Sequence, residues 1–428
     1  MTLTDPGPYH DASGYYEAKE RDENDPLASF RHRFVHSDPG LIYLDGNSLG
    51  RLPVAAVETI EEVSNRQWGD RLIRSWNEGW WDMPTRVGDL LAPLLGASPG
   101  EVIISDSTTV NLYKLATAAL ASCPGDRNRI VTDDLNFPSD AYVLDSVARR
   151  FGGELEIVAS DGINGPIDRL TEAIDDRTAL VSLSHTTFKS GYTYDLGQVT
   201  ELAHGAGARM LWDCSHSVGS VPVDLDACDA DLAVGCTYKY LNGGPGSPAF
   251  LYVREDLQDV LENPIAGWWG HSRPFSFDLA FVPMEGIRRF QTGTMPILSL
   301  APIEAGVSLV LEAGIDAVRE KSMALSEYLI SQAREHLEPL WFEVASPTDP
   351  ERRGSHVAIS HEMAWPITRA MTERANVIPD FRTPDSIRLG LSPLYTSFVD
   401  VHTAVQRIVA IIKSKVHTDF VDDTATVT

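Results

Sequence analysis

Short apolar runs alternate with helical stretches over the first 300 residues of the chain. Each run ends in polar or turn residues, and a helical pattern follows most of them. This alternation predicts βαβ units and a mostly parallel sheet in an α/β fold. The strands expected in this sheet are Glu101–Ser105, Arg129–Thr132, Leu155–Ala159, Ala179–Leu183, Arg209–Asp213, Asp231–Gly235 and Pro248–Arg254.

The pattern changes near Leu298, where helices become longer and strands fewer. Here the pattern predicts a smaller α+β domain over residues 298–416, packed against a large domain over residues 51–297. Its expected helices and strands are Leu300–Glu312, Ile315–His336, Trp341–Ser346, His356–Ser360, Glu362–Ala375, Ile387–Leu391 and Phe398–Lys415.

The two ends of the chain lie outside these domains. Residues 1–50 are expected to form an N-terminal arm and an active-site loop, with the polar first 25 residues loosely held. A helical period begins after Pro53. Residues 417–428 are expected to be a frayed tail.

Composition narrows the class of protein. A chain of 428 residues with 43% apolar and 22% charged residues fits a globular protein of two domains. The net charge of −26 argues against nucleic acid or an anionic membrane surface as a partner. The four cysteines lack disulfide-like or metal-ligand spacing, which indicates a reducing compartment and no metal. Without a signal peptide or an apolar run of about 18 residues, a cytoplasmic location is expected.

Asp213 ends one predicted strand, and Lys239 closely follows the next one. Open α/β sheets bind ligands at the carboxyl ends of their strands. A buried acid and amine at this edge suit pyridoxal phosphate. The lysine would form a Schiff base with the aldehyde, and the acid would keep the pyridine nitrogen protonated. From these two residues alone, an ordinary acid and base at strand ends is the alternative.

Two further patterns admit both a binding and a structural interpretation. Thr108 and Thr109 stand where a helix begins after a strand, a place that either binds phosphate or simply caps the helix. Arg388 lies inside an apolar strand and needs an anionic partner. That partner is either the carboxylate of an amino-acid substrate or a carboxylate within the protein.

Eight separated segments resemble the kynureninases, which are pyridoxal phosphate enzymes of the aspartate-aminotransferase-like fold type I. In chain order they are LDGNSLG (44–50), STTVNL (107–112), FPSD (137–140), DCSH (213–216), TYKYLNGGPG (237–246), GWWGH (267–271), GIRRFQTGTMPI (286–297) and IRLGLSPLYTSF (387–398). Each segment is weak alone, but the resemblance extends over roughly residues 28 to 413 in the right order.

The resemblance implies a fold type I PLP-dependent transferase fold with a site on named residues. Lys239, Tyr238 and Asp213 would be catalytic, with Tyr238 acting through the phosphate as the base that collapses the gem-diol formed when water adds to the γ-carbonyl. Cofactor binding would fall to Thr108, Thr109, Phe137, Asp140, Ser184, Asp213, His216, Tyr238, Lys239, Trp268 and Thr294. The substrate would contact Asn47, Ser48, His271 and Arg388.

The implied activity is hydrolysis of the Cβ–Cγ bond of L-kynurenine, giving anthranilate and L-alanine in tryptophan catabolism. Gly293 and Thr294 replace a serine–asparagine pair found in relatives that favour 3-hydroxykynurenine, although the ring substitution preferred stays open. The implied assembly is a homodimer with its site at the subunit interface. The roles of five residues are left open: Trp76, Trp80, Trp81, His185 and Lys189.

Two other functions compete with this interpretation. The first is a different pyridoxal phosphate reaction on the same scaffold, such as β-elimination, desulfuration or cleavage of a ring-modified kynurenine. A desulfurase would need a cysteine on a mobile loop, which the placement of the four cysteines does not suggest. The second is a non-catalytic binding protein, against which the set of Lys239, Asp213, Tyr238 and Arg388 argues.

Overall fold

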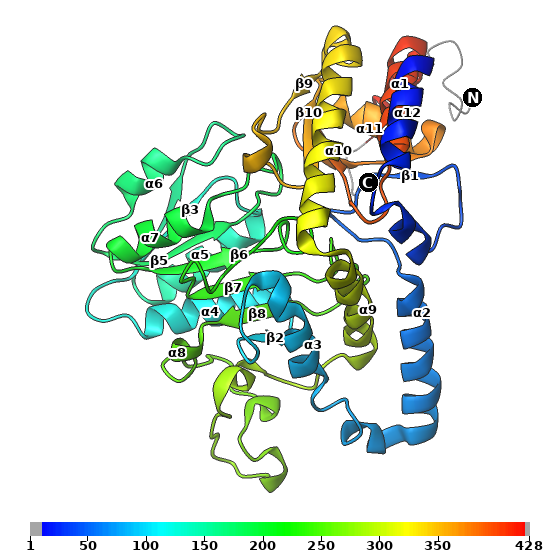
Figure 1. The fold of residues 1–428 in the computed structure, drawn as a ribbon. Coiled ribbons are helices and arrows are strands. Elements are labelled where there is room, and N and C mark those ends of the chain that lie inside the picture. Colours follow the sequence, from blue (N-terminus) through cyan, green and yellow to red (C-terminus); the bar gives the residue numbers. More distant parts are fainter. Residues whose placement is uncertain (1–10, 424–428) are drawn as a thin grey trace.

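The computed structural model describes residues 11–423 and centres on a seven-stranded sheet (Figure 1). The strand order is β2-β8-β7-β6-β5-β3-β4, with β8 antiparallel to both neighbours and all other pairs parallel. The strands are β2 (Val102–Ile104), β3 (Arg129–Asp133), β4 (Leu155–Val158), β5 (Thr178–Ser184), β6 (Arg209–Asp213), β7 (Leu232–Gly235) and β8 (Phe250–Val253). The predicted mostly parallel sheet is confirmed.

Apolar side chains cover both faces of this sheet. Successive residues of a strand point to opposite faces, so Val181 and Trp212 join one apolar cluster while Leu180 and Leu211 join another. This double burial explains why the strands are apolar throughout rather than alternating. The surrounding helices are α3 (Met83–Leu91), α4 (Thr108–Ala121), α5 (Pro138–Arg150), α6 (Ile167–Ala173), α7 (Leu196–Gly205) and α8 (Glu255–Gln258).

A second, antiparallel sheet with the order β12-β13-β10-β9 lies in the C-terminal third of the chain. Its strands are β9 (Glu343–Val344), β10 (His356–Ser360), β12 (Asp380–Arg382) and β13 (Ser386–Gly390). The helices of this part are α9 (Ile297–Ala313), α10 (Ile315–His336), α11 (Ala364–Ala375) and α12 (Phe398–Ser414). A separate apolar core is formed by this sheet with α10, α11 and α12, whereas the buried apolar residues of α9 belong to a cluster of the large sheet. The domain limits at residues 51, 298 and 416 stay predictions.

The N-terminal part of the chain is attached to this second region. β1 (Ile42–Tyr43) pairs in parallel with β11 (Val377–Ile378). The Leu44 N–H donates to the Ile378 carbonyl at 2.8 Å, and the Gly390 N–H donates to the Leu44 carbonyl at 2.7 Å. The loop that follows β1 is thereby held beside β13.

The described residues near both ends of the chain are more ordered than the sequence suggested. Helix α1 (Ala12–Glu23) lies along α12 (Figure 1), and the Asp22 carboxylate accepts the N–H groups of Phe398 and Val399 at 2.7 and 3.0 Å. The prediction of a loose arm was therefore wrong for the described residues of α1; residues 1–10 lie outside the described part. The expected frayed tail was also wrong at its start, because η11 (Val416–Phe420) buries Phe420; residues 424–428 are not described.

The helical period after Pro53 is confirmed as α2 (Val54–Glu61), which continues as a π-helix η3 (Glu62–Arg71). The 3₁₀ segments are η2 (Ala28–Arg33), η4 (Leu72–Trp76), η5 (Ala92–Leu95), η6 (Trp268–Gly270), η7 (Pro274–Ser276), η8 (Gly286–Phe290), η9 (Glu338–Leu340) and η10 (Pro350–Arg352). Among residues 11–423, no single helix is long and apolar enough to cross a membrane. Only α9 and α10 taken together meet the length and composition test, and they are bent by 83° where they meet.

Candidate functional site

A cavity of about 240 Å³ opens at the carboxyl ends of β6 and β7, beside the N-terminal loop and β13. Its lining residues are Asn47, Ser48, Thr108, Thr109, Phe137, Ser139, Asp140, Asp213, Ser215, His216, Tyr238, Lys239, Arg382 and Arg388. Of the site residues predicted from sequence, all described by the structure, only Ser184, Trp268, His271 and Thr294 are not in this lining.

Asp213, the last residue of β6, has surroundings that favour its ionised form over that of the neighbouring Asp140. Burial raises the pKa of Asp213 above its ordinary value, although the Lys239 charge and the hydrogen bonds from Ser215 offset part of this rise; the Ser215 nitrogen lies 2.8 Å from Asp213 Oδ1. Burial also raises the pKa of Asp140, well above its ordinary value, and the Asp213 charge raises it further. We infer that Asp140 keeps its proton and that Asp213 is the carboxylate facing Lys239.

Lys239 lies in the loop after β7, with its side chain half-buried in the cavity. Its Nζ atom lies 3.1 Å from Nε2 of His216. Burial, followed by the Lys239 charge, lowers the pKa of His216 well below its ordinary value, so this ring is neutral. Because this imidazole is neutral and no carboxylate of residues 11–423 forms an ion pair with Lys239, the amine suits a nucleophilic or proton-accepting role.

Two glycines allow the N-terminal loop to enter the site. The Gly50 N–H donates to the Tyr238 carbonyl at 2.7 Å, and a Cβ at position 50 would lie 2.3 Å from the Lys239 carbonyl oxygen. A Cβ at position 390 would lie 1.9 Å from Oδ1 of Asn47. Any side chain at either position would push the loop away from Lys239 or from β13.

Asn47 is fully buried, and neither Oδ1 nor Nδ2 of its amide has a hydrogen-bond partner among the described residues. Burying an unpaired donor and acceptor costs about 1–3 kcal/mol for each group, and such groups are rare in folded proteins. Because this amide lines the cavity, its free donor and acceptor are available to a bound ligand.

Arg388 lies on β13 and is fully buried. Its guanidinium forms an ion pair with Asp380, donates to Ser48 Oγ at 2.8 Å and donates to the Phe188 carbonyl. Asp380 is shared with Arg382, whose NH2 lies 3.0 Å away. A structural salt bridge is thus present, but two arginines share this one carboxylate, which leaves positive charge for an anionic ligand.

The N-terminus of α4 forms the opposite side of the cavity, where Thr108 and Thr109 begin the helix. Ser107 caps it by accepting the Val110 N–H at 3.4 Å. Unpaired N–H groups and the helix dipole at this end favour an anion such as phosphate. Phe137 lies nearby with 43% of its surface exposed, packed edge-on against Phe188.

Tyr238 lines the cavity next to Lys239. The neighbouring Cys236 and burial raise the pKa of its phenol above the ordinary value. The hydroxyl therefore keeps its proton at neutral pH and acts first as a donor.

The four predicted residues absent from the lining occupy two places. Ser184 ends β5 in register with Asp213, and its N–H donates to Asn136 Oδ1 at 2.7 Å. Trp268, His271 and Thr294 belong to the segment 267–294. Both ring nitrogens of His271 serve its own loop, since they contact the Ala280 carbonyl at 3.1 Å and the Arg273 N–H at 2.8 Å.

The residues of open role lie elsewhere. Trp76, Trp80 and Trp81 form an aromatic cluster with Trp269, in which the Trp81 and Trp269 rings are 4.2 Å apart. His185 is buried against Trp212, whereas Lys189 donates to the Thr383 carbonyl at 3.3 Å.

Sequence reasoning missed three lining residues as site members: Ser139, Ser215 and Arg382. Ser139 and Ser215 lie inside the FPSD and DCSH segments, whereas Arg382 lies six positions before Arg388 and outside every segment that carries the resemblance. The arginine in Asp380-Phe-Arg382 was the clearest available signal, because its strand pairs with the strand of Arg388.

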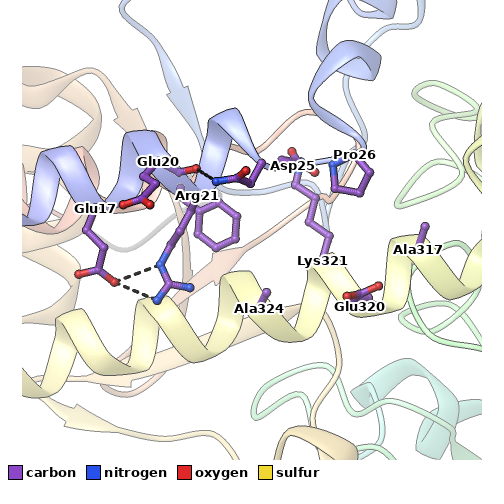
Figure 2. Close-up of a pocket in the computed structure, with 11 residues that line it drawn as sticks. Glu17, Glu20, Arg21, Asp25, Pro26, Ala317, Glu320, Lys321 and Ala324 are labelled. Carbon is purple, nitrogen blue, oxygen red and sulfur yellow. Dashed lines mark hydrogen bonds and ion pairs between the residues drawn. The ribbon is translucent and has the colours of Figure 1, made fainter.

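A second cavity, of about 430 Å³, lies between α1 and α10 (Figure 2). Its buried cation, Lys321, pairs with Asp25 at 2.6 Å, and Arg21 pairs with Glu17 at 2.9 Å. No predicted site residue lines it. Across residues 11–423, no group of three or more His, Cys, Asp or Glu side chains is arranged to hold a metal ion.

Comparisons with solved structures identify the fold. A cysteine desulfurase structure from Thermococcus onnurineus NA1 superposes with a TM-score of 0.75 at 19% identity, covering 92% of this chain and 98% of that one. The structure of a C-DES mutant, with glycine covalently linked to its PLP cofactor, gives a TM-score of 0.76 at 19% identity, covering 88% and 98%. These likenesses establish the fold type I architecture.

Sequence comparisons are more specific. Residues 318–408 match the model of the kynureninase C-terminal domain. The chain is 43% identical over 396 residues to a kynureninase of Burkholderia pseudomallei and 42% identical over 400 residues to one of Pseudomonas fluorescens. Each match covers 92% of this chain and 94% of the relative. The chain therefore belongs to the kynureninase family.

Proposed function

We propose that the chain is a pyridoxal phosphate-dependent hydrolase that cleaves L-kynurenine between Cβ and Cγ to give anthranilate and L-alanine. The name and close similarity of its relatives support this activity. The observation that carries it is the meeting of Lys239, Asp213, Asn47 and Arg388 around one cavity.

The residues present fit the cofactor. Lys239 would hold its aldehyde carbon, Asp213 its ring nitrogen, and the α4 N-terminus with Thr108 and Thr109 its phosphate, while Phe137 offers an aromatic surface. When bound, pyridoxal phosphate supplies an aldehyde that links to amines and a ring that accepts the electron pair left on a carbon. An ionised Asp213 keeps that ring nitrogen protonated.

Arg388 and Asn47 would bind the α-carboxylate of the substrate. Asp380 and Ser48 hold the guanidinium in place before the substrate arrives, so little side-chain entropy is lost on binding. The unpaired Asn47 amide gains its missing partners only when a ligand is present. Both interactions orient Cα toward Lys239.

Lys239 would then move the proton of Cα, since its amine has no counter-ion in contact and faces the cavity. Tyr238 would donate its proton near the reacting carbonyl, because its raised pKa keeps the phenol protonated.

We also propose a homodimer in which Trp268, His271 and Thr294 approach the site of the partner. The segment that carries them extends away from the main sheet (Figure 1) and exposes apolar side chains: Trp268, Phe275, Phe277, Leu279, Phe281 and Val282. Exposed apolar side chains gathered in one segment mark an interaction surface. The cytoplasmic location stays a prediction.

The direct test is to add the purified chain and cofactor to L-kynurenine and follow anthranilate fluorescence. Anthranilate and alanine in equal amounts would support the proposal, and a parallel assay with 3-hydroxykynurenine would define the preferred ring. Sulfide from cysteine without anthranilate from either kynurenine would instead support desulfuration. Binding of cofactor with no turnover of any of these substrates would support a non-catalytic role.

A further inference from the structure

Lys114 is a fully buried lysine outside the cavity lining. It lies in the second turn of α4, and its ammonium is close to three acceptors: Asp106 Oδ2 at 2.8 Å, Ser105 Oγ at 3.1 Å and the Phe290 carbonyl at 2.8 Å. Replacing a buried ion pair by apolar residues is often neutral or stabilising. The presence of this pair therefore points to a role besides stability.

Asp106 connects this lysine to the start of α4. It follows β2 closely and has a backbone φ of +45°, a left-handed conformation that is uncommon for residues other than glycine. Its carbonyl accepts the Ala249 N–H at 2.8 Å, while its carboxylate binds Lys114 and accepts from Ser105 Oγ. These contacts fix the turn that leads into Thr108 and Thr109.

The same carboxylate binds the segment that carries Thr294. Thr292 Oγ1 donates to the two oxygens of Asp106 at 3.0 and 3.2 Å. Lys114 also holds the Phe290 carbonyl of this segment, and Phe290 is completely buried. One ion pair thus joins the helix start to the residues immediately before Gly293 and Thr294.

The charges of the pair matter for an anion at the α4 N-terminus. Burial acts to raise the pKa of Asp106, but Lys114 and the hydroxyl donors outweigh it and bring the pKa below its ordinary value. Asp106 is therefore ionised two residues before Thr108. Without Lys114, this negative charge would repel a phosphate at the helix start.

We propose that Lys114, Asp106 and Thr292 form a positioning network that presets the phosphate-binding end of α4 and neutralises the charge beside it. The ligand group it serves is the phosphate monoester of the cofactor, so the inference rests on the proposed function. The network contributes to the affinity for the phosphate rather than to the chemistry at Lys239.

The test compares pyridoxal phosphate with pyridoxal, which lacks the phosphate. Dissociation constants of both are measured by titrating the full-length apoprotein. In Lys114→Met, affinity for pyridoxal phosphate should fall about ten- to a hundredfold, the range for a lost charged interaction. Affinity for pyridoxal should stay unchanged, because that ligand carries no phosphate charge to be repelled.

Two further variants separate charge from folding. Adding Asp106→Asn to Lys114→Met removes the uncompensated carboxylate and should restore most of the affinity for pyridoxal phosphate. Thr292→Val keeps the side-chain volume and removes only the hydroxyl that donates to the two oxygens of Asp106, so this variant should fold even where Lys114→Met does not. It should lower the same affinity by a smaller factor in the same direction.

Lys321→Met is the matched control, because it breaks the other buried lysine–aspartate pair, with Asp25, far from the α4 N-terminus. It should leave the ratio of the two affinities as in the unaltered chain. Equal losses for both ligands, or an unchanged ratio in Thr292→Val, would overturn the network. An unaltered chain that binds no pyridoxal phosphate would instead overturn the proposed function, and the inference with it.

Discussion

The two cavities differ in how their polar groups are satisfied. The cavity between α1 and α10 is larger, at about 430 Å³, yet its buried lysine has a carboxylate at 2.6 Å (Figure 2). The cavity at the strand ends is about 240 Å³ and contains an unpaired Asn47 amide and the Lys239 amine. Unsatisfied groups that converge on a space, and not its volume, distinguish a site from a gap between helices.

The largest effect should come from Lys239→Ala. Loss of the amine removes both covalent attachment and the proton carrier, so turnover should fall by about 10⁴-fold or more. The visible absorbance of the bound cofactor should disappear as well. Anthranilate release and an absorbance spectrum measure both effects, with Lys321→Ala as the control. A yellow and active variant would contradict the assignment.

In the second cavity, Lys321→Met should destabilise the protein without touching chemistry. Removing one member of a buried pair leaves Asp25 uncompensated, which costs about 3–5 kcal/mol. Urea unfolding should show this loss of stability. The kcat, measured at urea concentrations well below the unfolding transition, should stay unchanged. Adding Asp25→Leu should recover most of the stability. A fall in kcat with stability unaffected would mean that the two cavities do not differ as described.

Arg388→Gln should raise KM for kynurenine about a hundredfold, with a smaller change in kcat, because a charged contact to the carboxylate is lost. The variant also leaves Asp380 with Arg382 alone, so its stability must be measured beside its kinetics. Arg388→Lys keeps the charge but loses the two parallel hydrogen bonds of a guanidinium, so its KM should lie between those of the unaltered chain and of Arg388→Gln. An unaltered KM would reassign the arginine to a purely structural role.

Asn47→Ala should separate activity from stability. Its amide has no partner in the described part of the protein, so truncation removes an unpaired group and should not destabilise the fold. Meanwhile kcat/KM should drop about tenfold, because the substrate loses a hydrogen bond. Thermal unfolding and initial rates give the two readings. Marked destabilisation would show that the amide has a structural partner.

The smallest effect concerns Asp45, a mostly buried carboxyl beside the first cavity. Burial, followed by the charge of Asp380, raises its pKa to about 6. Because the folded pKa exceeds the unfolded one, its contribution to stability is greatest below about pH 4 and is lost as the pH rises through 6. Asp45→Asn should therefore gain about 1–3 kcal/mol of stability relative to the unaltered chain between pH 4 and 7. The free energy of unfolding of both proteins is measured against pH. If the two curves run parallel between pH 4 and 7, the predicted role of Asp45 is wrong.

Local patterns predicted most of the frame, since β6, β10 and α10 begin and end at the residues expected. Apolar strands bounded by turns are determined by nearby residues. Motif residues from separate parts of the chain, such as Asp213 at the end of β6 and Lys239 after β7, also line one cavity. The features that could not be predicted from the sequence depend on contacts between residues far apart along the chain.

The two-residue strands β1 and β11 are examples, because each exists only through pairing with the other across more than 300 residues. Helix α1 was missed for a similar reason: it is polar along most of its length and is held by α12. The engagement of Arg388 by Asp380 was also invisible, since it depends on the register of β12 against β13.

The pairing of Leu44 with Gly390 has a consequence for synthesis of the protein. Asn47 is made early and Arg388 late, and the backbone contact that brings them together needs both. A ribosome-bound chain that has already formed the strand and loop of Lys239 therefore lacks Arg388, the arginine proposed to bind the substrate carboxylate, until β13 has been made as well. A protein cut short before β13 would therefore contain Lys239 without the arginine proposed to bind the substrate.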